Sequence, residues 1–297
     1  MKLFLMFIIF ASCLPGQAAV KLNILRPVNN PLYQLGIGSF VEIEHDKETM
    51  RGVFLGRMVN HEIFSEEFLL MDEKSGKVFL INSHSFRNKS RMHPLISTID
   101  QTGSTCAAYA IYHLWQQNNE LYSAKSPELN KTFVQERTRM KLLEEAISRY
   151  YLGRSVNLNL ILNKFADRFN FKCIVRTFKD VAKARQFVYD RTQEAKPVMI
   201  EFNIGPFMAI STHGLQDFET GTVFDNNLWV PRKKGEKNKG GHVVVAAGSF
   251  QVNGKPKVMV LDSNWNEPRV WDLSDYFPAS TAIEEMIFHT CSPLTDL

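Results

Sequence analysis

The sequence predicts an α+β protein, and three patterns in the chain carry that prediction. Short apolar segments separated by tight turns run through residues 37–86, which is typical of β-strands. Apolar residues at helical spacing begin at Cys106. Near the C-terminus, two apolar runs flank the pair Asn253-Gly254, a strong β-hairpin signal. We therefore expect a small β-rich module, followed by a domain with a helical part and an antiparallel β part.

The first 18 residues have the form of a secretory signal peptide. Lys2 precedes a short apolar run, and small residues lead up to Ala18. Cleavage after Ala18 predicts an exported protein, periplasmic or extracellular. The alternative is lipoprotein-type cleavage before Cys13, which would leave a lipid anchor on that cysteine. No stable membrane span is expected, because no segment reaches the roughly 20 apolar residues that a spanning helix needs.

The β-rich module and its linker are expected over residues 19–95. Polar and apolar residues alternate over residues 40–44, and the turn at residues 73–76 separates two apolar runs. Several short strands joined by tight turns suggest an SH3-like barrel. A polar, proline-ended segment over residues 86–94 then forms the connection, so the larger domain is expected over 96–297.

The larger domain is predicted to begin with helices and to end mostly with strands. Helical spacing covers residues 106–115, 133–151, 158–169 and 180–194. Strands are predicted after Cys173 and at residues 198–202, 242–247 and 257–261.

Two separated segments predict a thiol nucleophile and its base. Cys106 stands at the expected start of a helix, a position that favours a thiolate. His242 enters a predicted strand, and imidazole is the side chain best suited to remove and return a proton near neutral pH. The Asn253-Gly254 hairpin would bring His242 and Asp262 to one end of adjacent strands, where a carboxylate can orient the ring.

These segments resemble those of papain-like cysteine peptidases, over residues 96–297. Gly103-Ser-Thr-Cys106-Ala-Ala-Tyr is similar to the family's nucleophile segment, and Gly241-His-Val-Val-Val-Ala-Ala-Gly248 to its histidine segment. His242 follows Cys106 by 136 residues, within the roughly 130 to 150 residues typical of the family. The resemblance implies a papain-like fold for this domain and an oxyanion-stabilising role for Gln101, which stands one position closer to the cysteine than in papain.

The third catalytic residue has two candidates, Asp262 and Asn264. The segment Val258-Met-Val-Leu-Asp262-Ser-Asn264-Trp resembles the strand that carries this residue in the family. Papain itself has Asn-Ser-Trp, whereas this chain has Asp-Ser-Asn-Trp. Aligning the strand selects Asp262, which is the pattern of the related bacteriocin-processing peptidases, and Asn264 is the alternative.

The resemblance implies an exported thiol peptidase that hydrolyses peptide bonds in a peptide or protein substrate. A papain-like acyl transferase or amidase would use the same cysteine and histidine. A catalytically inactive papain-like protein that binds a partner is a third hypothesis, and it predicts a Cys106 thiol of ordinary reactivity.

Other function classes find little support in the sequence. The chain of 297 residues is 44% hydrophobic and 22% charged, a globular composition, and its net charge of +4 is too small to indicate nucleic-acid binding. It has no Cys-x-x-Cys or His-Glu-x-x-His pattern and no glycine-rich phosphate loop. We therefore expect no metal and no cofactor.

Three cysteines remain once Cys13 leaves with the signal peptide, so at least one is unpaired within the chain. Cys106 is the candidate free thiol. Cys173 and Cys291 form either a disulfide or two buried thiols.

Overall fold

A computed structural model describes about half of the chain. The described residues are 21–27, 35–45, 48–60, 65–82, 95–96, 106–107, 109–111, 113–114, 162, 171–194, 196–203, 207–217, 223–231, 241–262, 269–273 and 286–293.

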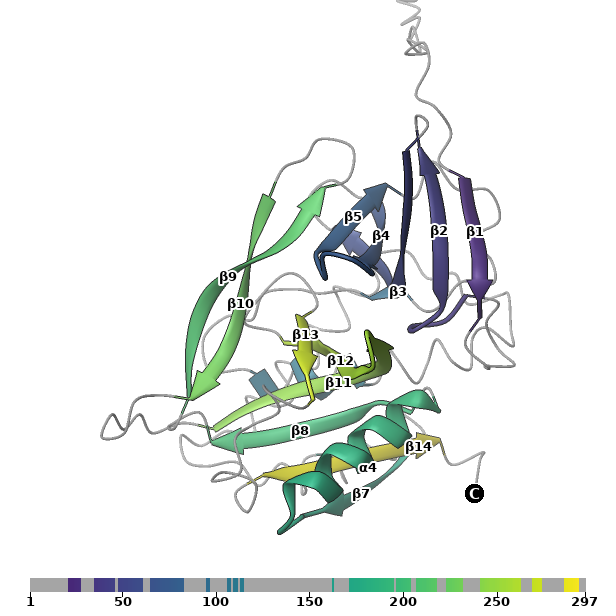
Figure 1. Cartoon of the computed structure of the whole chain (residues 1–297). Helices are drawn as coiled ribbons and strands as arrows, with labels where there is room; N and C mark the ends of the chain where they lie inside the picture. Colours follow the sequence, from purple (N-terminus) through teal and green to yellow (C-terminus); the bar gives the residue numbers. More distant parts are fainter. Residues whose placement is uncertain are drawn as a thin grey trace, which may run out of the picture.

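The described residues form two β-sheets (Figure 1). The first sheet has eight strands: β1 (Lys21–Arg26), β2 (Phe40–His45), β3 (Glu48–Asn60), β4 (Ser65–Asp72), β5 (Val78–Asn82), β6 (Leu95–Ile96), β9 (Phe207–Asp217) and β10 (Val223–Pro231). The second has six, in the spatial order β13 (Arg269–Asp272), β12 (Lys255–Leu261), β11 (Gly241–Val252), β8 (Val198–Asn203), β14 (Ile287–Pro293) and β7 (Phe171–Arg176). All pairings are antiparallel except β3 with β6 and β5 with β9.

The expected fold class, α+β with a papain-like helical part, is wrong. The structure is mostly antiparallel β-sheet, and helix is its minor component. The physical reason is that the apolar segments after residue 197 pair as long strands, whose backbone hydrogen bonds extend both sheets. The SH3-like barrel is not formed either, because β5 pairs with β9 and the first sheet thereby continues into a later part of the chain.

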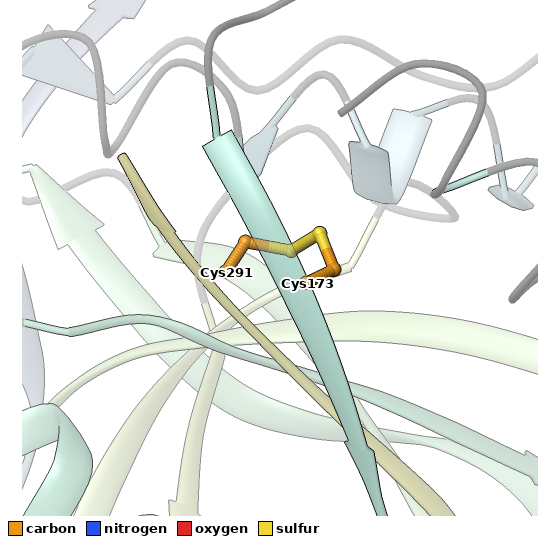
Figure 2. Close-up of a disulfide and its surroundings, with 2 residues drawn as sticks. All are labelled: Cys173 and Cys291. Carbon is orange, nitrogen blue, oxygen red and sulfur yellow. A yellow bond between two sulfur atoms is a disulfide. The ribbon is translucent and has the colours of Figure 1, made fainter. Parts of the chain in front are cut away.

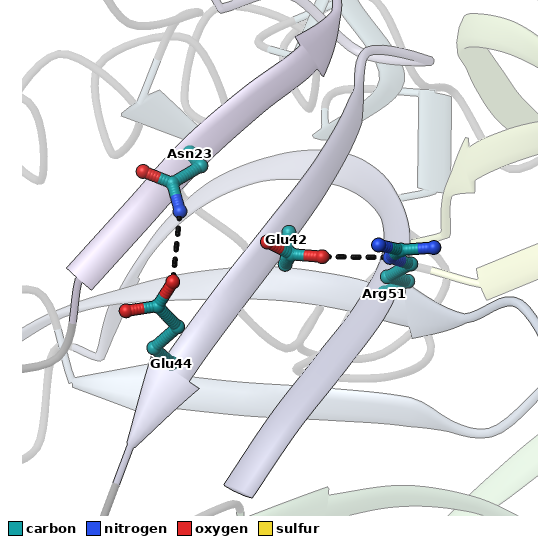
Figure 3. A network of polar contacts seen from close by, with 4 residues as sticks. All are labelled: Asn23, Glu42, Glu44 and Arg51. Carbon is teal, nitrogen blue, oxygen red and sulfur yellow. Dashed lines mark hydrogen bonds and ion pairs between the residues drawn. The ribbon is translucent and has the colours of Figure 1, made fainter. Parts of the chain in front are cut away.

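Strand β2 shows how its sequence forms the first sheet. Val41 and Ile43 are buried in an apolar cluster of strands β1 to β5, while the alternate residues Glu42 and Glu44 lie on the other face. Figure 3 shows their partners on the neighbouring strands. Arg51 Nε of β3 donates to Glu42 at 2.7 Å, and an equivalent cross-strand contact joins Glu44 to β1. The alternation predicted for residues 40–44 is confirmed.

Strand β11 is buried on both faces, as its continuous apolar run predicts. Val243 and Val245 belong to a cluster that joins the two sheets, and Val244 and Ala246 to a cluster on the opposite face. The predicted hairpin to β12 is confirmed. Asn253 and Gly254 form its turn with φ angles of 51° and 74°, the left-handed conformation that Asn-Gly turns supply.

The predicted helix at residues 180–194 is confirmed as α4 (Val181–Gln193), which covers the second sheet in Figure 1. Asp180 caps it by accepting from the Ala182 N–H at 2.8 Å. Ala184, Val188 and Thr192 are buried at intervals of four residues, the spacing of a single helix face. The Thr192 hydroxyl bonds the Ser249 hydroxyl and so ties the end of α4 to β11.

The main core joins the two sheets. It contains buried residues of β3, β4 and β5 from the first sheet and of β8, β11 and β12 from the second. Gly248 marks the tightest approach, because a Cβ atom there would lie 2.5 Å from Cγ2 of Ile37. The two sheets therefore pack directly against each other at β11.

A disulfide joins Cys173 and Cys291, as Figure 2 shows. The two residues face each other across the β7–β14 pair and close a loop with a sequence separation of 118 residues. Of the two alternatives for these cysteines, the structure has the disulfide.

Several predictions fall on residues outside the described part of the chain. They concern the signal peptide with Cys13, the helix at 133–151 and most of 158–169, and the linker at 86–94. Among the described residues, no helix is long and apolar enough to cross a membrane.

Candidate active site

Cys106 lies on a short helical segment that packs into the main core. Residues 106, 107, 109–111, 113 and 114 are helical, and we call them the thiol helix. Ala107, Ala110 and Leu114 are buried in the core cluster, as their spacing predicts. Burial of this apolar side fixes the backbone and with it the Cys106 thiol, the free cysteine of the described residues.

His242 and Asp262 come from neighbouring antiparallel strands. His242 is the second residue of β11, and Asp262 directly follows β12. Val245 pairs with Leu261, so one further step in the same register places Val244 opposite Asp262. His242 is thus the diagonal neighbour of Asp262, close enough for long side chains to meet.

A direct hydrogen bond joins these two side chains. Nε2 of His242 lies 2.8 Å from Oδ1 of Asp262, and the two side chains are 4% and 0% exposed. A buried carboxylate is stable only when it is paired, and an imidazolium donor provides both a charge and a hydrogen bond. Asp262 therefore holds the ring of His242 in one orientation.

The surroundings of His242 favour its charged form. Burial disfavours the charged imidazole, but the charge and hydrogen bond of Asp262, together with a hydrogen bond and charge interaction of Cys106, raise the pKa of His242 to about 10. At neutral pH His242 is a cation between an acid on one side and a thiol on the other.

The imidazole links Cys106 to Asp262. A side-chain hydrogen bond connects Cys106 and His242. Because Nε2 is engaged by Asp262, Nδ1 is the ring nitrogen left for the thiol. The structure thus brings together three predicted site residues from two strands and a helix. Chemically, this arrangement can hold a thiolate beside a proton donor.

His113 is not among the residues predicted from the sequence, yet it lies at the same site. Its side chain is 1% exposed. Burial lowers the pKa of His113 to about 4, and the opposing attraction of Asp262 shows that the carboxylate acts on this ring as well. Its separation of seven residues from Cys106, two helical turns, is the signal in the sequence that could have identified it.

A third buried histidine lies elsewhere in the second sheet. Nε2 of His289 on β14 lies 3.3 Å from Oε2 of Glu201 on β8. The residues pair diagonally across the two strands, since Ile287 is opposite Glu201. This contact connects two strands of the sheet.

Two predicted site residues, Gln101 and Asn264, lie outside the described residues. Within the described part, no group of three or more His, Cys, Asp or Glu side chains is placed to hold a metal ion.

Comparison with protein-family models and with curated protein sequences gives no match. The functional interpretation therefore rests on the residues of this chain and their geometry.

Proposed function

We propose that this protein is a thiol hydrolase that cleaves peptide-type amide bonds, with Cys106 as nucleophile, His242 as proton carrier and Asp262 as the residue that orients the ring. The observation that carries the proposal is the imidazole of His242, bonded to Asp262 through Nε2 at 2.8 Å and to Cys106 on its other side. A nucleophile beside a base that is itself oriented by a third group is the signature of covalent catalysis.

Catalysis begins with the Cys106 thiolate and the His242 imidazolium. The sulfur attacks the amide carbonyl and forms a C–S bond, while the carbonyl oxygen takes up the negative charge. The imidazolium gives its proton to the amide nitrogen, the C–N bond breaks, and a thioester remains on Cys106. His242, now neutral, removes a proton from water, whose oxygen attacks the thioester. Release of the acid restores the thiolate and the imidazolium.

Two groups are proposed to stabilise the oxyanion, by resemblance to papain-like peptidases. They are the side chain of Gln101 and the backbone N–H of Cys106. Loss of one such donor costs about 3 kcal/mol in other enzymes. Gln101→Ala should therefore reduce the rate about a hundredfold or more without abolishing it.

The proposal is tested by alkylation of Cys106 with iodoacetamide from pH 4 to 9, on unreduced protein in which Cys173 and Cys291 stay paired. Peptide mapping identifies the labelled cysteine. An ordinary thiol reacts appreciably only near its pKa of about 8.5. We expect Cys106 to react at pH 5 at least tenfold faster than glutathione, and His242→Ala to remove this advantage. A rate that follows glutathione and ignores His242→Ala would overturn the proposal and favour an inactive binding protein.

Product analysis distinguishes a hydrolase from an acyl transferase that uses the same three residues. With a peptide library as substrate and a primary amine added, a hydrolase releases free carboxylates. A transferase forms new amides in proportion to the amine.

We also propose that the protein is exported. The support is the signal-like segment before residue 19 and the disulfide between Cys173 and Cys291, since disulfides persist in oxidising compartments. Fractionation of the source cell tests this, and a reduced protein in the cytosol would contradict it.

A further inference from the structure

His113 shares one face of the thiol helix with Cys106. A separation of seven residues corresponds to two helical turns, so both side chains project toward the same side. On that side lies Asp262, whose carboxylate acts electrostatically on the His113 ring. The helix therefore contributes two groups to the site: the thiol at its first described turn and an imidazole two turns later.

Asp262 lies between two imidazoles of different kind. His242, on β11, bonds to it directly at 2.8 Å. His113, on the thiol helix, interacts with it and is buried to 1% exposure. Both rings belong to elements that pack in the same core cluster, so neither can move away without disturbing it.

An uncharged polar ring suits the position beside Asp262. A lysine or a charged imidazole there would attract the carboxylate and repel the imidazolium of His242. A small side chain would leave space for water, which screens the attraction between Asp262 and His242. A neutral imidazole fills the space and leaves the negative charge of Asp262 to His242.

We propose that His113 is a positioning residue of the thiol site, an uncharged imidazole that keeps water from Asp262 and so strengthens the hold of Asp262 on His242. This inference rests on the proposed function. The low pKa of His113, about 4, supports it, because the ring is then neutral across the range in which the site would work.

The other charged groups around Asp262 come from three elements. The thiol helix provides Cys106, and β11 provides His242. Strand β13 provides Arg269, which is 1% exposed and pairs in register with Val260, two residues before Asp262. Arginine stays charged at every accessible pH, so it adds a constant field and no titration of its own.

The test compares three variants of the full chain by NMR of ¹⁵N-histidine-labelled protein. His113→Lys adds a charge beside Asp262, and His113→Ala admits water. His113→Phe is the matched control, because it keeps a ring of similar size without charge. The signal of His242 is assigned with His242→Gln, and circular dichroism establishes that each variant is folded.

In the wild-type protein we expect His242 to titrate at about pH 10 and His113 at about pH 4. His113→Lys and His113→Ala should each increase the acid dissociation constant of His242 at least tenfold. His113→Phe should leave it within about twofold. A residue that only fills the core would change stability but not this constant.

Two results would overturn the inference while leaving the proposed function intact. One is a His242 titration unchanged in every folded variant that has Lys or Ala at position 113. The other, which needs no variant, is a wild-type His113 that titrates above pH 6. Failure of the proposed function looks different: His242 would titrate near 6.5 in the wild-type protein, and Cys106 would react like glutathione.

Discussion

The surroundings of His242 and His113 give two equally buried imidazoles opposite chemistry. Both side chains are almost inaccessible, and both are influenced by Asp262. Yet the pKa of His242 is raised to about 10, whereas that of His113 is lowered to about 4. Burial penalises the charge of both rings, but His242 has a hydrogen bond to the carboxylate and a second contact to a thiol. A direct bond, rather than proximity alone, reverses the effect of burial.

The two rings also affect folding stability on opposite sides of neutral pH. The folded state holds the proton of His242 more tightly than the unfolded chain, so the stability from His242 is complete below pH 6.5 and is lost as pH rises through about 10. The folded state disfavours protonation of His113, so its contribution is present above pH 6.5 and is lost as pH falls through about 4.

The largest expected effect comes from Asp262→Asn, which removes the cause of the contrast. Without the carboxylate, burial dominates at both rings, and the pKa of His242 should fall from about 10 to 6.5 or below. Histidine NMR measures this fall. An equivalent change in a Ser-His-Asp triad costs about 10⁴-fold in kcat, and we expect a loss of similar order here once a substrate is found.

Asp272→Asn is the matched control for that change. Asp272 is a buried carboxylate on β13 whose ion pair, at 3.4 Å, is with Lys257. We expect it to leave the titration of His242 within 0.3 pH units, an estimate of roughly the twofold scatter of such measurements. Equal shifts in the two variants would show that the field of the whole sheet, and not the bond to Asp262, sets the charge of His242.

Removal of the disulfide should lower stability without altering the contrast. Replacing both Cys173 and Cys291 by Ser should reduce the free energy of unfolding by about 2–5 kcal/mol, because the unfolded chain regains the freedom of a long loop. Urea denaturation measures this loss. Both histidines should keep their titrations, since the disulfide lies on the β7–β14 pair and the site lies on β11 and β12. Displaced titrations would mean that the site depends on the far edge of the sheet.

His113→Phe should sharpen the contrast from the acid side. The variant has no ring to protonate, so it should lack the stability loss that His113 causes between pH 6.5 and 4. A displacement of about 2.5 units in pKa corresponds to on the order of 3 kcal/mol. Urea denaturation at pH 7 and pH 4 measures it, and an identical acid-side loss in both proteins would count against the low pKa of His113.

The smallest expected effects concern two glycines of β11. A Cβ atom at Gly248 would lie 2.5 Å from Ile37, so Gly248→Ala should cost about 1–3 kcal/mol through overpacking between the sheets. At Gly241, directly before His242, a Cβ atom meets nothing within 4 Å. Gly241→Ala should therefore change thermal stability and the His242 titration very little. A large effect at Gly241 and none at Gly248 would reverse the packing described for this strand.

Local features of the fold are accessible from the sequence because they depend on residues close in the chain. The Asn253-Gly254 turn sets the β11–β12 hairpin, and this hairpin places His242 and Asp262 at one end of two strands. Helical spacing after Cys106 and within α4 likewise depends on contacts one or two turns away. The error in fold class arose at long range, where the pairing of β5 with β9 carries the first sheet past the expected module.

The sequence by itself determined which side chains are capable of thiol chemistry: Cys106, His242 and a nearby acid, in an order that predicts nucleophile, base and orienting group. Only the tertiary structure decided that Asp262 bonds Nε2 of His242, that His113 stands beside the same carboxylate, and that one ring is charged and the other neutral. The reason is physical: a residue's type fixes its ordinary pKa, but burial and partners from distant segments fix its charge in the folded protein.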